Sequence, residues 1–388
     1  MKRALDLHLS DAERELYEQT WRLADDVLAP IAAAGEPGRV NRPLVRALAE
    51  HGLLGRLFGG GGGSGGGSVS AIELCLIREA LARGCTEAET AFALQGLGAY
   101  PILQAGTDAL RDEWLPRVAA GTAVAAFALT EPEAGSDPAG LSLRASADDD
   151  GGWRLDGEKL WISNAPAADV YTVFVRTDAN APGARGLTAF AVPGDADGLT
   201  GEPRDLLAPH AIGSLRFDGV RVEAAQMLGD PGAGFRVAMS TLDLFRPSVG
   251  AFAIGMARAA LELATSYALT RRTFGRALSD HQAVAHALAQ LHAETEAARL
   301  LVHQAARAHD AGAPDPNLAA MSKLLATEVA QRAVDAAVQF HGAVALERGH
   351  PLEHLYREVR APRIYEGASE IQREIIARGL FRAAEARA

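Results

Sequence analysis

The stretch WRLDGEKLWI, residues 153–162, sets the fold class because apolar and polar side chains alternate along it. Such a period of two is typical of a β-strand with one buried face, and an Asp-Gly pair favours a tight turn. We therefore predict a β-hairpin that turns at Asp156 and Gly157. Three further runs are rich in β-branched and aromatic residues: 170–176, 187–192 and 215–222. Because no helix-length segment separates these runs, residues 122–235 are predicted to form a small antiparallel β-domain.

Helical periodicity flanks this β-domain on both sides. Ser10 and Glu13 form a predicted capping box, and apolar residues at steps of three and four recur through residues 1–121. After residue 235 the same periodicity gives four long apolar stripes: 245–267, 284–305, 321–340 and the one that follows 369. Four stripes joined by short loops predict a four-helix bundle over residues 236–388. The predicted fold class is thus α+β, mostly α, with an N-terminal helical domain, a middle β-domain and a C-terminal four-helix bundle.

The composition argues against several classes of partner. The chain of 388 residues has a formal net charge of −11, which argues against binding to nucleic acid or to an anionic membrane. It has no apolar run near the ~18 residues of a membrane span and no apolar signal segment at its beginning. Its two cysteines, Cys75 and Cys85, form no CxxC motif, which favours buried thiols in a reducing compartment. We therefore expect a cytoplasmic protein.

A segment of low complexity, GGGGGSGGGS at residues 59–68, interrupts the N-terminal helices. No GK[ST] follows it, which argues against a phosphate-binding P-loop. Its composition favours a flexible connector, and a flap over a substrate entrance is the sharper hypothesis. The sequence does not decide between these two roles.

The stretch RIYEGASEIQR, residues 363–373, contains the strongest candidate for catalysis. Ser369 and Gln372 form a predicted capping box, so a helix begins there and Glu366 lies just before its N-terminus. The helix dipole favours the charged carboxylate, whereas apolar neighbours raise its pKa by desolvation. A carboxylate under both influences is a plausible general base. The competing interpretation is a solvated surface carboxylate, because charged side chains are mostly exposed.

Four segments resemble the motif set of the acyl-CoA dehydrogenase family in order and spacing: TEPEAGSD (130–137), WISNA (161–165), RRTFG (271–275) and IYEGASEIQ (364–372). The resemblance covers essentially the whole chain. It implies a flavoprotein with FAD that introduces a trans double bond between Cα and Cβ of an acyl thioester. It also implies acyl-CoA or an acyl-carrier thioester as substrate, an electron-transfer flavoprotein as electron acceptor, and a homotetramer or homodimer.

The resemblance assigns roles to individual residues. Glu366 is implied as the catalytic base that removes the α-proton, while the β-hydrogen passes as hydride to flavin N5. The implied cofactor-binding residues are Phe127, Leu129, Thr130, Gly135, Ser136, Trp161, Ser163, Arg271, Phe274, Gln282, Gln339, Gly342, Ala368 and Glu370. The implied substrate-binding residues are Ser136, Asp243, Arg246, Tyr365 and Gly367. Without the resemblance, Asp243 and Arg246 are an i, i+3 ion pair on a helix, and Trp161 packs with Trp153 in the hairpin.

The chain departs from the family pattern at three alanines. Ala343 and Ala345 replace glycines that are usual in the family, and Ala368 stands where a threonine hydroxyl commonly touches the cofactor. These alanines support the hypothesis of a non-catalytic acyl-thioester-binding protein. Two enzymatic functions on the same fold also stay open: a flavin-dependent oxidase or monooxygenase, and a dehydrogenase of carrier-linked acyl groups. No motif reports the length or shape of the acyl group.

The sequence HPLEH, residues 350–354, matches the H-x-x-E-H pattern of inverted zinc peptidases. A third ligand would have to come from elsewhere, and the segment lies inside the region that resembles the acyl-CoA dehydrogenases. We therefore expect no metal site.

Overall fold

The computed structural model describes residues 8–59 and 69–386. The chain divides into two compact units that alternate along the sequence. The helical unit comprises the chain up to Ala29, Ser70–Glu89, and the chain from Asp243 onward. The sheet unit comprises Pro30–Val69 and Thr90–Leu242. The predicted fold class is confirmed, because helices precede and follow a small, largely antiparallel sheet. The predicted boundaries at 121/122 and 235/236 stay a prediction.

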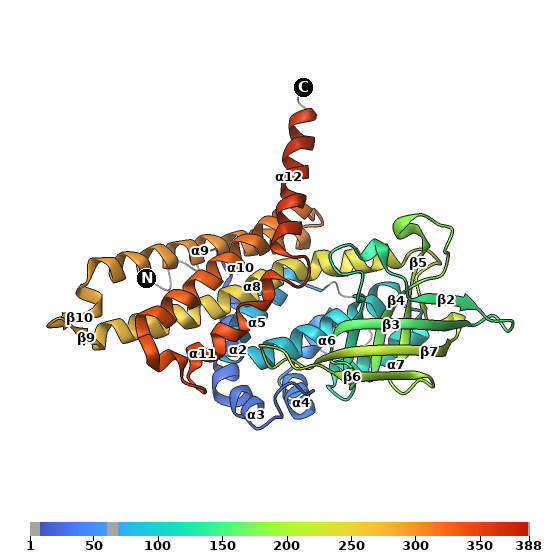
Figure 1. Ribbon diagram of the computed structural model, residues 1–388, viewed down its shortest axis with the longest axis horizontal. Coiled ribbons are helices and arrows are strands. Elements are labelled where there is room, and N and C mark those ends of the chain that lie inside the picture. Colours follow the sequence, from blue (N-terminus) through green and yellow to red (C-terminus); the bar gives the residue numbers. More distant parts are fainter. Residues whose placement is uncertain (1–7, 60–68, 387–388) are drawn as a thin grey trace. The chain divides into compact units, whose positions relative to one another are not determined.

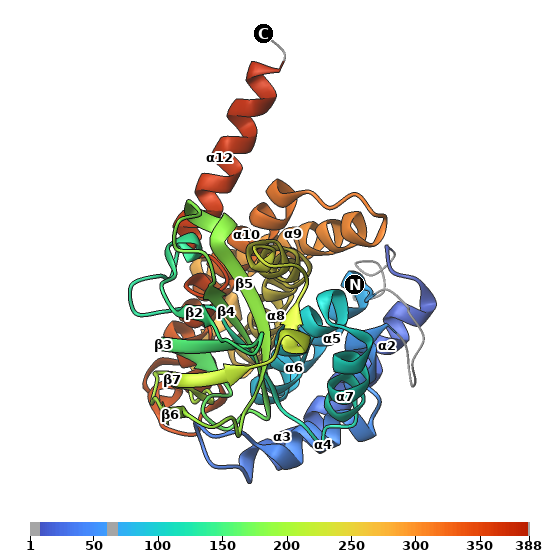
Figure 2. The same cartoon turned by 90° about the vertical axis from the view of Figure 1, so that its right-hand side faces the viewer.

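The sheet unit is built on a mixed sheet in which antiparallel pairing dominates (Figures 1 and 2). Its strands are β1 (Ala125–Ala128), β2 (Arg144–Ala147), β3 (Trp153–Ser163), β4 (Val170–Arg176), β5 (Leu187–Pro193), β6 (Leu199–Pro203), β7 (Ile212–Val222) and β8 (Met227–Leu228). The order across the sheet is β6-β7-β3-β2-β4-β5-β8, and β1 pairs with β4 in parallel. The strands predicted at 170–176, 187–192 and 215–222 are therefore present.

The predicted hairpin at Asp156 and Gly157 is wrong. Residues 153–163 form one continuous strand, β3, which pairs antiparallel with β7. The Asp-Gly pair instead marks a register shift between Leu155 and Gly157, where the N–H of Gly219 on β7 donates to Asp156 Oδ1 at 2.8 Å. An Asp-Gly pair can adopt the backbone conformations of a β-bulge as well as those of a turn. The pair therefore correctly indicated an irregular backbone at this point, but the irregularity is a bulge and not a turn.

Helices α4 (Arg42–Glu50), α6 (Thr86–Ala105) and α7 (Asp108–Ala119) precede the sheet in the chain. Apolar side chains of α6 and α7 share one buried cluster with β1, β4 and β5, among them Ile102 and Trp114. The approach of α6 to the sheet is close at Gly98, because a Cβ there would lie 2.5 Å from the main-chain nitrogen of Ala126. Thr172 Oγ1 on β4 also donates to the carbonyl of Gly98 at 2.8 Å.

The helical unit contains long helices that pack side by side. They are α2 (Asp11–Leu23), α5 (Ala71–Gly84), α8 (Gly234–Thr270, in this unit from Asp243), α9 (Gln282–Asp310), α10 (Pro316–His341), α11 (Pro351–Glu358) and α12 (Ser369–Glu385). Helix α10 packs on α9, α11 and α12, and α5 packs on α2 and α9. A π-helical turn (Ala24–Leu28) and α3 (Ala29–Ala33) follow α2, and a short hairpin of β9 (Arg272–Thr273) and β10 (Arg276–Ala277) joins α8 to α9. The predicted capping box of Ser10 and Glu13 is confirmed.

The buried face of α10 overlaps only in part with the predicted stripe, since Val329 and Ala333 are buried as expected. Met321 and Leu325, which the apolar pattern assigned to the core, are exposed in the single chain. The buried face is formed mainly by small or polar residues: Ala319, Ser322, Lys323, Ala326, Ala330, Ala333 and Ala337. Small side chains let neighbouring helices approach closely. This face of α10 is therefore buried against other helices, although its residues are less apolar than the exposed Met321 and Leu325.

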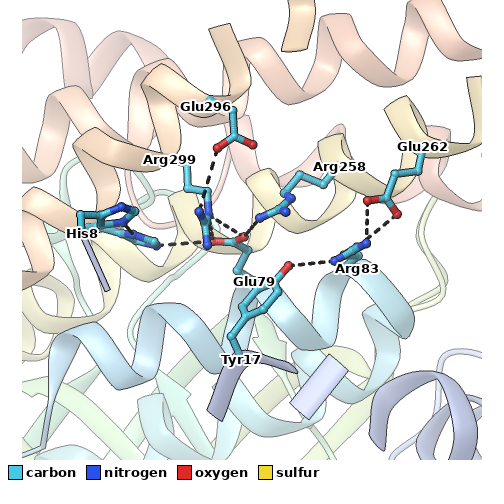
Figure 3. A network of polar contacts seen from close by, with 9 residues as sticks. His8, Tyr17, Glu79, Arg83, Arg258, Glu262, Glu296 and Arg299 are labelled. Carbon is cyan, nitrogen blue, oxygen red and sulfur yellow. Dashed lines mark hydrogen bonds and ion pairs between the residues drawn. The ribbon is translucent and has the colours of Figure 1, made fainter. Parts of the chain in front are cut away.

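A buried ionic network joins α5, α8 and α9 (Figure 3). Glu79 on α5 is fully buried and accepts hydrogen bonds from Arg299 Nε at 2.8 Å and from Arg258 Nη1 at 2.7 Å. His303 Nε2 lies 3.4 Å from the same carboxylate. Burial alone would raise the pKa of Glu79, but Arg299 and its other partners outweigh burial and hold that pKa well below its usual value. The carboxylate therefore stays charged inside the helical unit.

Candidate active site

Glu366 lies in the short connection between a 3-10 turn (Ala361–Arg363) and α12. Its backbone is left-handed, with φ at +50°. Among the described residues other than glycine, positive φ occurs at Trp161, Asn164, Phe274 and Glu366, and three of these four are predicted site residues. Such conformations cost roughly 1–3 kcal/mol each and concentrate at functional sites. The backbone thus marks three of the sequence candidates independently of their side chains.

The carboxylate of Glu366 is partly enclosed and lies near three cations. The residue is half-buried, and its Oε2 is sealed from solvent without a hydrogen-bond partner in the described parts of the chain. Burial raises the pKa of Glu366, and three nearby cations oppose that rise only in part. These cations are Arg78, Lys323 and Arg246. An oxygen that is enclosed and unpaired does not fit a solvated surface carboxylate.

Two of these cations are paired with carboxylates of the helical unit. Arg78 on α5 is buried, donates through Nε to Glu89 and through Nη1 to Ser248 Oγ at 2.7 Å. Arg246 Nη1 on α8 donates to Asp243 Oδ1 at 2.9 Å, which is the i, i+3 ion pair expected from the sequence. The positive charges near Glu366 are therefore partly balanced.

Lys323, the third cation, was not among the sequence candidates. It is fully buried on α10, and its Nζ donates to the main-chain carbonyls of Tyr365 at 2.9 Å and Gly367 at 2.6 Å. Burial lowers the pKa of Lys323 to about 8, although the charge of Glu366 opposes that shift. One signal could have found it: the chain has only three lysines, and this one falls within an apolar helical segment.

The predicted capping box at the start of α12 is wrong. Ser369 Oγ donates to Glu328 Oε1 on α10 at 2.7 Å, and Ala368 is the N-cap residue, with no side-chain cap. Gln372 Nε2 donates to the carbonyl of Gly367 at 2.8 Å, across the connection that carries Glu366. Gly367 has φ at +93°, and a Cβ there would clash with the Gln372 amide. The two side chains therefore hold the loop that precedes the helix.

The sheet unit carries the other group of candidates. The N–H of Leu160 donates to the carbonyl of Thr130 at 3.0 Å, which brings the predicted segments at 130 and 161 side by side. Trp161 lies at a register shift between Lys159 and Ile162 of β3 and leaves half of its surface exposed. Phe127, on β1, packs its ring on Phe174 of β4 at 4.8 Å between centroids rather than lying free. The remaining candidates of this unit are Leu129, Gly135, Ser136 and Ser163, of which Gly135 and Ser136 are exposed.

A buried ion pair supports the segment around Thr130, and the sequence candidates did not include it. Lys159 Nζ donates to Glu131 Oε1 at 2.8 Å and to the carbonyl of Leu129 at 2.9 Å. Glu131 also accepts from the main-chain N–H groups of Ser142 and Leu143. Burial lowers the pKa of Lys159 to about 8, and Glu131 opposes that shift. Lys159 in the sheet unit and Lys323 in the helical unit therefore play similar structural parts. Each is a buried lysine that donates hydrogen bonds to main-chain carbonyls of a predicted site segment.

A third group of candidates lies at the far end of α10. Tyr267 of α8 stacks on His341 of α10 with 4.1 Å between ring centroids, so these helix ends meet. The candidates near this end are Arg271, Phe274, Gln282, Gln339 and Gly342. Along α10, Gln339 lies about 24 Å from Lys323, from a helical rise of ~1.5 Å per residue. Within one chain, this group and Glu366 are not brought together.

The histidines of the HPLEH segment have local partners. His350 Nδ1 accepts from the N–H of Leu352, and His354 Nε2 lies 2.6 Å from Thr86 Oγ1. Within residues 8–59 and 69–386, no group of three metal-binding side chains was found. In the same ranges, no helix is both long and apolar enough to cross a membrane.

Family models match nearly the whole chain. They are the acyl-CoA dehydrogenase N-terminal domain over residues 10–122, the middle domain over 126–222 and the C-terminal domain over 232–381. These matches define a flavin-dependent oxidoreductase. The chain belongs to the acyl-CoA dehydrogenase family.

Individual relatives match this chain over nearly their full length. The probable acyl-CoA dehydrogenase FadE25 of Mycobacterium tuberculosis is 36% identical over 383 residues, covering 96% of each chain. The cyclohexane-1-carbonyl-CoA dehydrogenase of Geobacter metallireducens is 33% identical, covering 97% of this chain and 99% of the relative. The solved butyryl-CoA dehydrogenase of Megasphaera elsdenii has a TM-score of 0.90 at 34% identity, covering 96% of this chain and 99% of that one. A structure described as the electron transferring flavoprotein of Acidaminococcus fermentans has a TM-score of 0.90 at 30% identity, covering 97% and 100%.

The cofactor of the family is FAD, and similar solved structures include FAD complexes. The described residues fit such a group. The Phe274 ring is 97% exposed and the Trp161 indole 50% exposed, each on a left-handed backbone, so both leave apolar ring surface free for an aromatic ligand. Arg271 lies close to Phe274 in the chain and can donate two hydrogen bonds to a phosphate group.

Proposed function

We propose that this protein oxidises an acyl-CoA to the trans-2-enoyl-CoA, with Glu366 as the base that removes the α-proton. The observation that carries this proposal is the enclosed Oε2 of Glu366, which has no hydrogen-bond partner in the described chain and is free to accept a proton. When bound, FAD supplies the two-electron acceptor for the β-hydrogen.

The base has to act on a weakly acidic C–H bond. A glutamate with a reference pKa of about 4.3 does so only if the site stabilises negative charge on the thioester oxygen. Each preorganised donor contributes on the order of 3 kcal/mol to this stabilisation. We assign the main-chain N–H of Glu366 as one donor. Substrate binding excludes the remaining water, which raises the pKa of Glu366 further and matches it better to the proton transfer.

Other residues bind the substrate rather than react with it. The Asp243–Arg246 pair on α8 supplies a buried cation near the base, and Tyr365 and Gly367 flank the base in the chain. Ser136 contacts the pantetheine arm in this proposal. Butyryl-CoA and cyclohexane-1-carbonyl-CoA, named for two relatives, are the first acyl groups to test.

An assembly of several copies is part of the proposal. Helix α12 projects away from α10 in both views (Figures 1 and 2), and its Leu380 and Phe381 are exposed. Met321 and Leu325 expose further apolar surface on α10. Phe274 and Arg271 lie far from Glu366 along their own chain, which supports cofactor contacts to a neighbouring copy. We propose a homotetramer or homodimer in the cytoplasm that passes its electrons to an electron-transfer flavoprotein.

Anaerobic mixing with a panel of acyl-CoAs tests the reaction. A substrate should bleach the flavin absorbance of the purified protein, and Glu366→Gln should keep FAD but bleach about 10²–10⁴-fold more slowly. The matched control is Glu374→Gln on α12, an exposed glutamate paired with Arg378, which should bleach normally. Bleaching of the Glu366→Gln protein at the normal rate would show that another group is the base. Oxygen consumption during turnover would instead favour a flavin-dependent oxidase or monooxygenase.

A further inference from the structure

The connection that carries Glu366 is held from behind by one lysine. We infer that Lys323 is a positioning residue for the proposed reaction: its ammonium bonds the main-chain carbonyls on both sides of Glu366 and thereby fixes the direction of the carboxylate. This inference rests on the proposed function of Glu366 as the base. Lys323 itself contacts the main chain of the loop and is not assigned a contact with substrate.

The two hydrogen bonds of Lys323 exclude an extended backbone. Because Nζ lies 2.9 Å from the Tyr365 oxygen and 2.6 Å from the Gly367 oxygen, these two oxygens are at most about 5.5 Å apart. In an extended strand, groups two residues apart are about 6.7 Å apart. The chain must therefore turn at Glu366, and the residue's φ of +50° is the form that this turn takes. One ammonium group thus holds the bent backbone that carries the carboxylate.

The same loop has further attachments to its neighbours. Gln372 Nε2 donates to the Gly367 oxygen at 2.8 Å, so this carbonyl accepts two hydrogen bonds. Glu328, on α10, accepts from Ser369 Oγ at 2.7 Å and pairs with Arg363 at 3.0 Å. Lys323 and Glu328 therefore fasten the loop to α10 at two places, on either side of the base. This arrangement makes α10 the rigid element that sets the position of Glu366.

A lysine at this place is costly for stability alone. Lys323 is fully buried, and its bonds are to neutral carbonyls rather than to a carboxylate. Taking a charged group out of water costs several kcal/mol, so a buried charge is by itself weak evidence of a stabilising role. A buried ammonium group at this position is explained if its two hydrogen bonds to the loop, and its charge near Glu366, both contribute to the reaction.

The test compares Lys323→Met and Lys323→Arg as FAD-loaded proteins. At saturating acyl-CoA, the limiting rate of anaerobic flavin bleaching should fall on the order of 100-fold in Lys323→Met, because small displacements of a catalytic group have effects of this size. The apparent substrate dissociation constant should change much less. Lys323→Arg keeps the charge and donors and should restore part of the rate. Ser322→Ala, at the adjacent buried position on α10, is the matched control and should bleach normally.

A pH profile separates positioning from a merely structural role. Arg78 and Arg246 also face Glu366, from α5 and α8, and remain in the variant. Removal of the Lys323 charge should move the midpoint of bleaching to higher pH, because one of three cations that favour the carboxylate is gone. A Lys323→Met protein that is less heat-stable but bleaches with the normal limiting rate and midpoint would overturn the inference.

Two further results keep the inference testable on its own. If Lys323→Met does not fold, Lys323→Gln keeps a polar side chain at this position but removes the ammonium group, and it should lower the limiting rate about tenfold. A normal limiting rate and pH midpoint in Lys323→Gln would then overturn the inference. The failure of the proposed function is a different result, in which no acyl-CoA bleaches the unaltered protein or Glu366→Gln bleaches normally.

Discussion

Glu79 offers a measurement of how strongly the buried network holds the helical unit together. Glu79→Gln keeps the size of the side chain but removes the charge that balances Arg299 and Arg258 at this carboxylate. Arg299 and Glu79 are both fully buried, so the cations cannot turn to water without a rearrangement of α5 and α9. Breaking one partner of such a pair costs about 3–5 kcal/mol, because a buried charge is left uncompensated.

Glu262→Gln is the comparison for this experiment. Glu262 pairs with Arg83 in the same region (Figure 3), but 45% of its side chain is exposed to water. Arg83 keeps its contacts with the Trp21 ring and the Tyr17 hydroxyl when Glu262 is replaced, so loss of this partly screened pair should cost less than loss of Glu79. Urea titrations of both variants, followed by circular dichroism, should give a loss for Glu79→Gln several times that for Glu262→Gln. Equal losses would refute the view that desolvation, rather than the number of ion pairs, sets the cost.

Two other changes test the same structure at separate places. Burial lowers the pKa of His303 below 6.5. Between the lowered pKa of the folded protein and 6.5, the unfolded chain therefore binds more protons than the folded protein. The free energy of unfolding consequently falls as the pH drops through that window. His303→Gln should therefore reduce the loss of unfolding free energy between about pH 7 and pH 5, and an unchanged pH slope would contradict this. Gly98→Ala should destabilise the sheet unit by about 1–3 kcal/mol, because its Cβ would lie 2.5 Å from the Ala126 nitrogen. A melting temperature within error of the unaltered protein would show that α6 can shift without cost.

The sequence predicted elements whose signals are local. The strand at 170–176 has the predicted ends, and the Ser10–Glu13 capping box is present. The Asp156–Gly157 prediction was wrong because the partner of β3 is β7, some sixty residues later, and no local pattern reports that pairing. The side chain that caps or holds a loop depends on neighbours in space in the same way.

The candidate site was predictable in part. Glu366 and Trp161 were found from motifs, and their left-handed backbones are consistent with special roles. Lys323 was missed because a helical stripe was read from its large apolar residues, Met321 and Leu325, which are exposed instead. The residues on the face of Met321 and those on the neighbouring face of Lys323 both recur with the helical period. Periodicity alone therefore does not say which of the two faces of α10 is buried. The roles assigned to the individual site residues stay predictions.

The burial of two lysines also decides which reagents can reach this protein. The sequence contains Lys2, Lys159 and Lys323, and the latter two are fully buried. The cations that face solvent over residues 8–59 and 69–386 are therefore arginines and histidines. Reagents that couple to primary amines, whether dyes, cross-linkers or activated supports, find no accessible lysine in these ranges while the chain is folded. The onset of amine labelling at Lys159 or Lys323 consequently reports the opening of one unit or the other.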